Sequence, residues 1–184
     1  PTGGMLISIG ASHLEGLSTV EGVAREKSDL IAALPADGFA VLNADCRFTP
    51  QIRKLTSSRV LTFSVDGDGD LDATDVWFHA AGTTFKLEGR EVTTPLLGLH
   101  NLQNLLAALA AYRGLGVELD EVLPYVSELS GTRRRLEKKA LGGLTLLDDT
   151  YNANPESAKA SVRVLSGIHG HARLLAPLGS GFDR

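Results

Sequence analysis

Cysteine, aromatic residues and surplus positive charge are all scarce in this chain, and each scarcity excludes a class of protein. The single cysteine, Cys46, rules out an internal disulfide framework and fits a reducing compartment. Aromatic residues make up only 5% of the 184 residues, so the core that the 43% hydrophobic content predicts is aliphatic. The net charge of −4, with no basic stripe, argues against nucleic acid as a partner.

Long apolar runs are missing as well. No run approaches the roughly 20 residues that a membrane-crossing helix needs, and no signal peptide precedes the first expected strand. We therefore expect a soluble, cytoplasmic protein without membrane insertion, in the form of a monomer. The length allows one large domain or two modest ones.

Strand and helix patterns alternate along the first part of the chain, which is typical of an α/β fold with a mostly parallel sheet. Ser18 and Glu21 have the spacing of a capping box, which predicts where the first helix begins. Residues 130–132 are the expected hinge between two domains. The expected order is strand 5–9, helix 18–34, strand 39–43, helix 50–55, strand 59–65, short strands within 76–95 with a hairpin turn at Glu88-Gly89-Arg90, helix 101–113, helix 119–129, strand 136–141, strand 144–149 and strand 174–178.

The most informative stretch is the polar run Asp148-Asp149-Thr150-Tyr151-Asn152-Ala153-Asn154-Pro155. It follows a short apolar strand, and its end can cap a helix, because Asn154 suits the N-cap and Pro155 the first helical position. In open α/β sheets, ligands bind just beyond the carboxyl ends of strands. A well-capped turn is the plainer explanation for Asp-Asp-Thr alone, whereas the length of the run favours a functional site.

Lys27 is an anomaly on the first expected helix. It lies seven residues after Val20 and seven before Leu34, which puts it on the apolar stripe of that helix. One interpretation is an amine that snorkels to solvent at the edge of the stripe. The other is an inward-facing lysine with a chemical role, since burial of a charged amine is costly.

Three segments together resemble the signatures of the Mur ligases: Gly10-Ala11-Ser12-His13-Leu14-Glu15-Gly16, His100-Asn101-Leu102-Gln103-Asn104-Leu105-Leu106-Ala107-Ala108, and the polar run at 148–155. Their order and spacing match across nearly the whole chain. Within that family, the polar run resembles the members that join D-alanyl-D-alanine to UDP-N-acetylmuramoyl-tripeptide through an acyl phosphate. The resemblance implies part of a mostly parallel-sheet, ATP-binding central domain at residues 1–131 and the beginning of a Rossmann-like C-terminal domain at 132–184.

The resemblance implies ATP and Mg²⁺ as cofactors. His13 and Lys27, fourteen residues apart, match the family's metal-binding histidine and a lysine that is often carbamylated. A carbamylated Lys27 would act as a carboxylate-like group that helps to bind magnesium. With Arg135, these two residues are the expected catalytic groups.

The family's nucleotide and acceptor sites also map onto this chain. Asn101 and Asn104 would lie beside the adenine, with His100 supporting their loop. Arg135 would reach the nucleotide from the domain junction, although Arg134 stands where the family usually has glycine.

The polar run supplies the remaining site residues that the resemblance implies. Asp149 would bind the ribose, and Tyr151, Asn152 and Asn154 would shape the site for the incoming dipeptide.

Two family elements are absent from the sequence: the P-loop run Gly-x-x-Gly-Lys-Thr/Ser, and Gly-Asp-Met-x-Glu-Leu after the strand expected at 174–178. We therefore expect a piece of a longer ligase that is inactive by itself. Two alternatives stay open: a non-catalytic remnant that binds nucleotide weakly or serves as an interaction module, and a ligase similar to folylpolyglutamate synthase.

Overall fold

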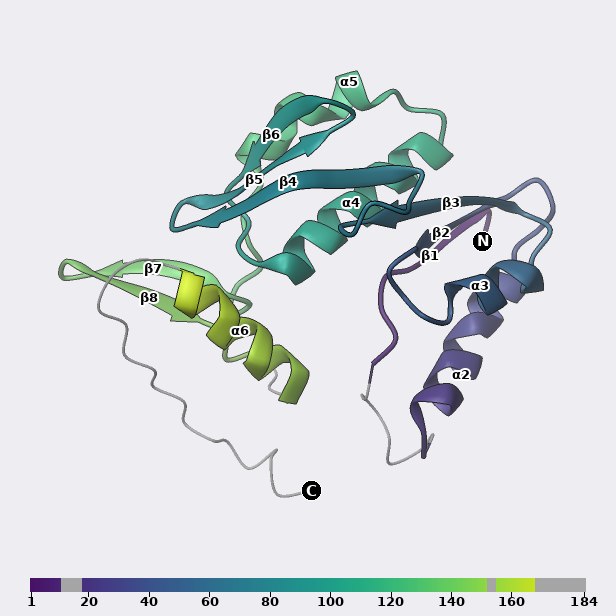
Figure 1. Cartoon of the computed structure of the whole chain (residues 1–184), viewed down its shortest axis with the longest axis horizontal. Coiled ribbons are helices and arrows are strands. Elements are labelled where there is room, and N and C mark those ends of the chain that lie inside the picture. Colours follow the sequence, from purple (N-terminus) through teal and green to yellow (C-terminus); the bar gives the residue numbers. More distant parts are fainter. Residues whose placement is uncertain (11–17, 152–154, 168–184) are drawn as a thin grey trace.

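The computed structural model describes residues 1–10, 18–151 and 155–167, which form two sheets with helices around them (Figure 1). The larger sheet has the order β1-β2-β3-β4-β5-β6, and the smaller one pairs β7 with β8. In chain order the elements are β1 (Gly3–Leu6), α2 (Val20–Ala32), β2 (Phe39–Asn43), α3 (Thr49–Ile52), the 3₁₀ helix η1 (Arg53–Leu55), β3 (Arg59–Ser64), β4 (Leu71–His79), β5 (Gly82–Leu87), β6 (Arg90–Thr94), α4 (Leu99–Gly114), α5 (Leu119–Val122), the 3₁₀ helix η2 (Leu123–Glu128), β7 (Glu137–Leu141), β8 (Leu144–Asp148) and α6 (Pro155–Gly167).

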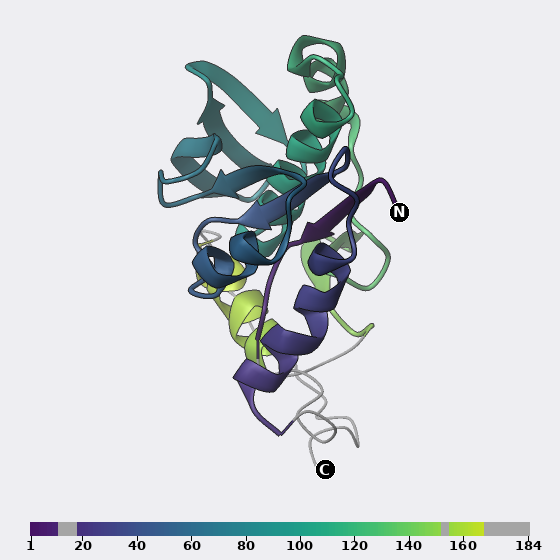
Figure 2. The same cartoon turned by 90° about the vertical axis from the view of Figure 1, so that its right-hand side faces the viewer.

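Strands β1 to β4 are parallel, and helices pack on both faces of β2. In β2, Ala40 and Leu42 point into a cluster with α2 and α3, whereas Val41 points into the cluster that α4 covers from the other side. Figure 2 shows α2 and α4 on different sides of the sheet. Both faces of β2 are therefore apolar, as expected of a strand in the middle of a parallel sheet.

Strands β4, β5 and β6 extend the sheet as an antiparallel meander. The hairpin turn predicted at Glu88-Gly89-Arg90 is confirmed, and both Glu88 and Gly89 have positive φ, as a tight turn of this kind requires. The change to short strands was expected at residue 76, but β4 begins at Leu71. Its alternation starts with Leu71 and Ala73, which are buried within a stretch of acidic residues that hides the pattern in the sequence.

Three other boundaries differ from the prediction for local reasons. The first helix is capped by Thr19, whose hydroxyl accepts a hydrogen bond from Gly22 N (3.0 Å), so the capping box at Ser18 and Glu21 was wrong by one residue. The ladder of β1 ends at Leu6, beyond which the side chain of Asn43 donates to Ile7 O (3.0 Å) in place of a strand partner. The helix expected at 119–129 divides into α5 and η2, because Pro124 cannot donate the backbone bond that an α-helix needs there.

The smaller sheet is a hairpin whose turn lies at Gly142-Gly143, between the strands expected at 136–141 and 144–149, with positive φ at both glycines. Helix α6 follows it, and the strand expected at 174–178 lies outside the described residues. The smaller sheet touches the larger one where Lys138 Nζ donates to Ala80 O (2.8 Å), in the turn between β4 and β5. Among the residues that the structure describes, no helix has the length and apolar character that a membrane span requires.

Candidate functional site

Asp149 directly follows β8, at the carboxyl end of the strand where the sequence predicted a site residue. Its Oδ1 accepts a hydrogen bond from Leu136 N (3.2 Å), and its Oδ2 accepts one from the hydroxyl of Ser161. The half-buried carboxylate therefore ties the end of β8 to the segment before β7 and to α6.

Arg135 lies in a tightly held turn next to Asp149. Its two neighbours, Arg134 and Leu136, both have positive φ, a conformation that costs free energy for residues with a Cβ atom. The cost is offset by hydrogen bonds from Arg134 N to Glu137 Oε2 (2.9 Å) and from Tyr151 N to Arg134 O (3.0 Å). The guanidinium carbon of Arg135 lies 4.3 Å from the centre of the Tyr151 ring, so sequence residues 16 positions apart meet here.

His100, in the first turn of α4, faces Arg135 and Asp149 from the unit that contains the larger sheet. Its ring is half-buried, and its Nδ1 is a buried atom without a hydrogen-bond partner among the described residues. Burial lowers the pKa of His100 below 6.5; the charge of Asp149 opposes this shift and the charge of Arg135 adds to it. The charges of Asp149 and Arg135 therefore both act on the start of α4.

Asn101 and Asn104 follow on the same helix but have different surroundings. Asn101 Nδ2 donates to Leu97 O (2.9 Å), so this amide holds the loop that leads into α4. Asn104 is exposed, one turn further along. Of the two, Asn104 has the amide that is accessible to a ligand.

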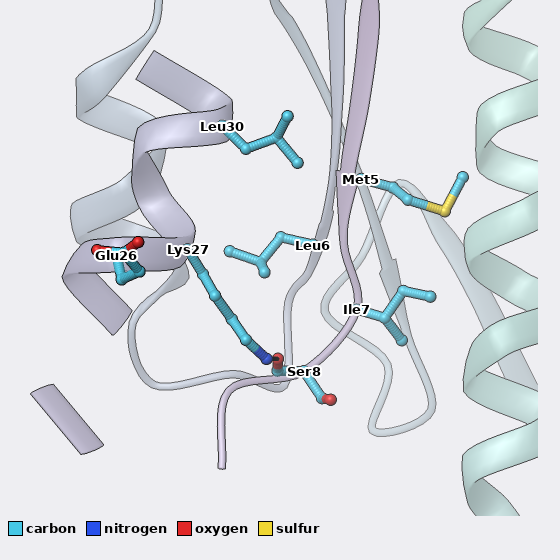
Figure 3. A pocket seen from close by; sticks show the side chains of 7 residues that line it. All are labelled: Met5, Leu6, Ile7, Ser8, Glu26, Lys27 and Leu30. Atoms are coloured by element: carbon cyan, nitrogen blue, oxygen red, sulfur yellow. Dashed lines mark hydrogen bonds between the residues drawn. The ribbon is translucent and has the colours of Figure 1, made fainter. Parts of the chain in front are cut away.

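Lys27 occupies a separate part of the structure, between α2 and the end of β1. Its Nζ donates to Ser8 O (3.2 Å), and its half-buried stem passes Leu6 at the edge of an open cavity of about 470 Å³ (Figure 3). The side chain therefore lies on the side of α2 that faces β1, as the apolar stripe predicted. Its role in metal binding stays a prediction, because His13 lies outside the described residues, and the described residues contain no cluster of three acidic, histidine or cysteine side chains able to hold a metal.

Sequence reasoning overlooked a polar clamp at the carboxyl ends of the parallel strands. Besides the Asn43 bond to β1, the carboxylate of Asp45 accepts hydrogen bonds from the hydroxyl of Ser64 and from Val65 N (3.0 Å), at the end of β3. The signal was present, since Asn43-Ala44-Asp45 follows an apolar strand directly. The clamp ties the loop after β2 to the ends of its two neighbouring strands.

Of the residues that the sequence singled out, the structure brings Arg135, Asp149 and Tyr151 together opposite His100. Asn101 and Asn104 lie on the same helix as His100, whereas Lys27 is not in this group. His13, Asn152 and Asn154 lie outside the described residues.

Comparison with known proteins shows the family. Residues 1–112 match the Mur ligase middle domain, so the chain belongs to the Mur ligase family. It is 32% identical over 182 residues to the UDP-N-acetylmuramoyl-tripeptide--D-alanyl-D-alanine ligase of Bacillus subtilis (strain 168), covering 97% of this chain and 39% of that protein. The chain thus spans about two-fifths of the length of this relative.

Solved structures show the same relationship. The crystal structure of MurF from Acinetobacter baumannii superposes with a TM-score of 0.84 at 31% identity, covering 91% of this chain and 38% of that one. MurF from Thermotoga maritima, crystallised with ADP, gives a TM-score of 0.76 at 26% identity, covering 90% of this chain and 39% of that one. The α/β fold with a mostly parallel sheet is therefore confirmed.

Proposed function

We propose that this chain supplies the later part of the central domain (residues 1–131) and the beginning of the C-terminal domain (residues 132–184) of an ATP-dependent, amide-forming ligase. Its reaction would join D-alanyl-D-alanine to UDP-N-acetylmuramoyl-tripeptide, as the name of the Bacillus subtilis relative states for that protein. The observation that carries the proposal is the group of Arg135, Asp149 and Tyr151 at the end of β8, opposite the start of α4. Because this group faces the start of α4, a nucleotide bound between them would contact both units of the fold.

The residues in this group fit a nucleotide. Arg135 is exposed and forms no salt bridge within the described part of the chain, so its guanidinium is available for phosphate oxygens. The exposed amide of Asn104 on α4 offers further hydrogen bonds to a nucleotide. Asp149 retains lone pairs that can accept from ribose hydroxyls, since a carboxylate has about four acceptor positions.

Magnesium would be held by His13 and by a carbamylated Lys27. The contact from Lys27 Nζ to Ser8 O puts this amine at the carboxyl end of β1, where ligands bind in parallel sheets. Mg²⁺ prefers oxygen ligands, which favours the carbamate over the free amine. A ¹³C-bicarbonate signal of a carbamate that disappears in Lys27→Arg would support this assignment; no signal at any bicarbonate concentration would remove Lys27 from the metal site.

The chain's own residues would act by binding and positioning. ATP with magnesium supplies the activation of the tripeptide carboxylate as an acyl phosphate. Arg135 would stabilise negative charge that develops on the transferred phosphoryl group, and Asp149 would fix the ribose. Tyr151, Asn152 and Asn154 would orient D-alanyl-D-alanine so that its amine can attack the activated carboxyl group of the tripeptide. The protein would act as a monomer in the cytoplasm.

The first prediction concerns the 184 residues by themselves. We expect no ligation from them, because the run Gly-x-x-Gly-Lys-Thr/Ser is absent and phosphate positioning supplies most of the catalysis in phosphoryl transfer. The measurement is phosphate release with ATP, Mg²⁺, UDP-N-acetylmuramoyl-tripeptide and D-alanyl-D-alanine. Phosphate release that requires both substrates would contradict the expectation.

The product of the complete gene tests the function itself. We expect it to form the pentapeptide product with one ADP and one phosphate per bond, detected by mass spectrometry. Glutamate as the acceptor, with a folate as the acid, should give no product; product formation there would support a ligase similar to folylpolyglutamate synthase. Nucleotide binding without ligation of either acceptor would support the non-catalytic alternative.

A further inference from the structure

Arg135 lies just before β7 and Tyr151 lies just after β8, and the two side chains are in contact. The guanidinium carbon lies 4.3 Å from the ring centre, which is a favourable cation–π distance. Both side chains are exposed, and 62% of Tyr151 is accessible to solvent. Such an exposed aromatic ring buries little apolar surface, so core packing does not explain its place.

The backbone holds the two side chains in fixed relation to each other. Arg135 N donates to Thr132 O (3.1 Å), and Tyr151 N donates to Arg134 O (3.0 Å). Leu136 is only 5% exposed and anchors the turn in the core. With the backbone fixed, the remaining freedom of Arg135 is in its long side chain.

That side chain has no anionic partner among the described residues: no salt bridge to Arg135 is formed there. An unrestrained arginine samples many rotamers, and ordering it on ligand binding weakens the binding. The Tyr151 ring restricts this sampling before any ligand arrives. The charge of Arg135 nevertheless acts on the start of α4, since it contributes to lowering the pKa of His100.

Contact with the Tyr151 ring is compatible with further hydrogen bonds from Arg135. A guanidinium is planar with its five N–H donors in its plane, so a ring that lies flat against one face blocks none of them. A phosphate can then accept two parallel N–H bonds at the edge of the same guanidinium. One side chain can thus be held by Tyr151 and bind an anion at the same time.

We propose that Tyr151 is a positioning residue for Arg135, whose ring holds the guanidinium ready for a nucleotide phosphate. The inference rests on the proposed nucleotide role of Arg135 and adds a role to the dipeptide contact that the family resemblance implies for Tyr151. The inference predicts that nucleotide affinity depends on the ring of Tyr151 and not on its hydroxyl. It also predicts that Tyr151 affects nucleotide affinity only while Arg135 is present.

The test uses the product of the complete gene and a non-hydrolysable ATP analogue with Mg²⁺. Tyr151→Leu should raise the Kd for the analogue about two- to fivefold, the range of an exposed cation–π contact, whereas Tyr151→Phe should bind close to the wild type. In an Arg135→Ala background, Tyr151→Leu should cause no further change. An equal loss in both backgrounds, or a Tyr151→Phe variant as weak as Tyr151→Leu, overturns the inference.

A second readout separates this inference from the proposed ligase function. The Arg135 Hε resonance, seen with ¹⁵N-labelled arginine, should lie upfield from the ring current and move downfield in Tyr151→Leu but not in Tyr151→Phe. A protein that shows this shift and the coupled Kd values but ligates nothing would refute the ligase function and leave the positioning role standing. A protein that ligates normally with an Arg135 resonance indifferent to Tyr151→Leu would refute the positioning role alone.

Discussion

Asp149 carries both a structural and a proposed binding role, which a careful choice of substitutions can separate. Both of its oxygens already accept hydrogen bonds, from Leu136 N and from Ser161. Asparagine can keep the bond from Leu136 N, and the hydroxyl of Ser161 can then donate its one hydrogen to Ser157 O (2.9 Å). Alanine loses the acceptor altogether, so an effect of Asp149→Ala on nucleotide binding would be confounded by loss of local structure.

We therefore expect Asp149→Asn, in the product of the complete gene, to weaken ADP binding by about tenfold or more, because a hydrogen bond to a charged group is worth roughly 1.5–3 kcal/mol. Its Tm should fall less than that of Asp149→Ala. Calorimetric titration with ADP and thermal unfolding measure the two effects.

Asp148→Asn is the matched control at the preceding position. Lys139 and then Thr150 hold the pKa of Asp148 at about 2, so this change removes a structural ion pair. ADP affinity that is unaltered in Asp149→Asn, or that is equally altered in Asp148→Asn, would make the strand end a structural turn.

His100 should give the protein a sensitivity to acid. Burial lowers the pKa of His100 below its unfolded value of 6.5, so the unfolded chain takes up a proton more readily than the folded protein. Stability is then intact above pH 6.5 and is lost as the pH falls through the folded pKa. We expect the Tm to drop between pH 7.5 and 5.5 by less in His100→Gln than in the wild type. A drop of the same size in both would assign the acid sensitivity to other groups.

At the level of elements, the start of α4 depends on a glycine that brings two units of the fold together. Gly98 caps α4 with φ of +85°, and a Cβ atom there would lie 2.6 Å from Val164 Cγ2 on α6. Val164 is β-branched, so its side chain cannot easily move aside. The glycine therefore permits both the turn into α4 and the close approach of α6.

Gly98→Ala should accordingly cost more than the roughly 1–3 kcal/mol of backbone strain that alanine pays at φ of +85° and ψ of +158°, a region that almost only glycine adopts. Gly89→Ala is the matched control, since Gly89 has φ of +78° with no atom within 4 Å of the added Cβ. The excess cost of Gly98→Ala should be relieved by adding Val164→Ala. Denaturant unfolding measures all three variants. Equal costs for Gly98→Ala and Gly89→Ala would show that α6 does not press on the start of α4.

The helices, strands and turns were predictable where the residue types in the sequence match the burial and backbone conformation of the folded protein. They were not predictable elsewhere. The bounds of β2 and the turns at Gly89 and Gly143 follow from apolar alternation and from glycines where positive φ is needed. The beginning of β4 was not predictable, because its two buried residues lie among exposed acids. The polar run predicts a candidate site at the end of β8, whereas the contact of Arg135 with Tyr151 depends on positive φ at Arg134 and Leu136, which side chains with a Cβ disfavour.

At the scale of the whole molecule, two sheets meet around the candidate site. The larger sheet contributes the start of α4, and the smaller one contributes the segments that flank β7 and β8. Besides the approach of Val164 to Gly98, the bond from Lys138 to Ala80 O joins them. These contacts hold the two units beside each other and leave Arg135 and Tyr151 exposed.

The central claim is that a nucleotide binds at this junction and contacts both units. Hydrogen exchange of the complete gene product, with and without ADP and Mg²⁺, tests it most directly. We predict slower exchange in two separate segments, the first turns of α4 and residues 134–151, because the nucleotide would be held from both sides. Protection confined to one of the two segments, or absent from both at saturating ADP, would contradict the account.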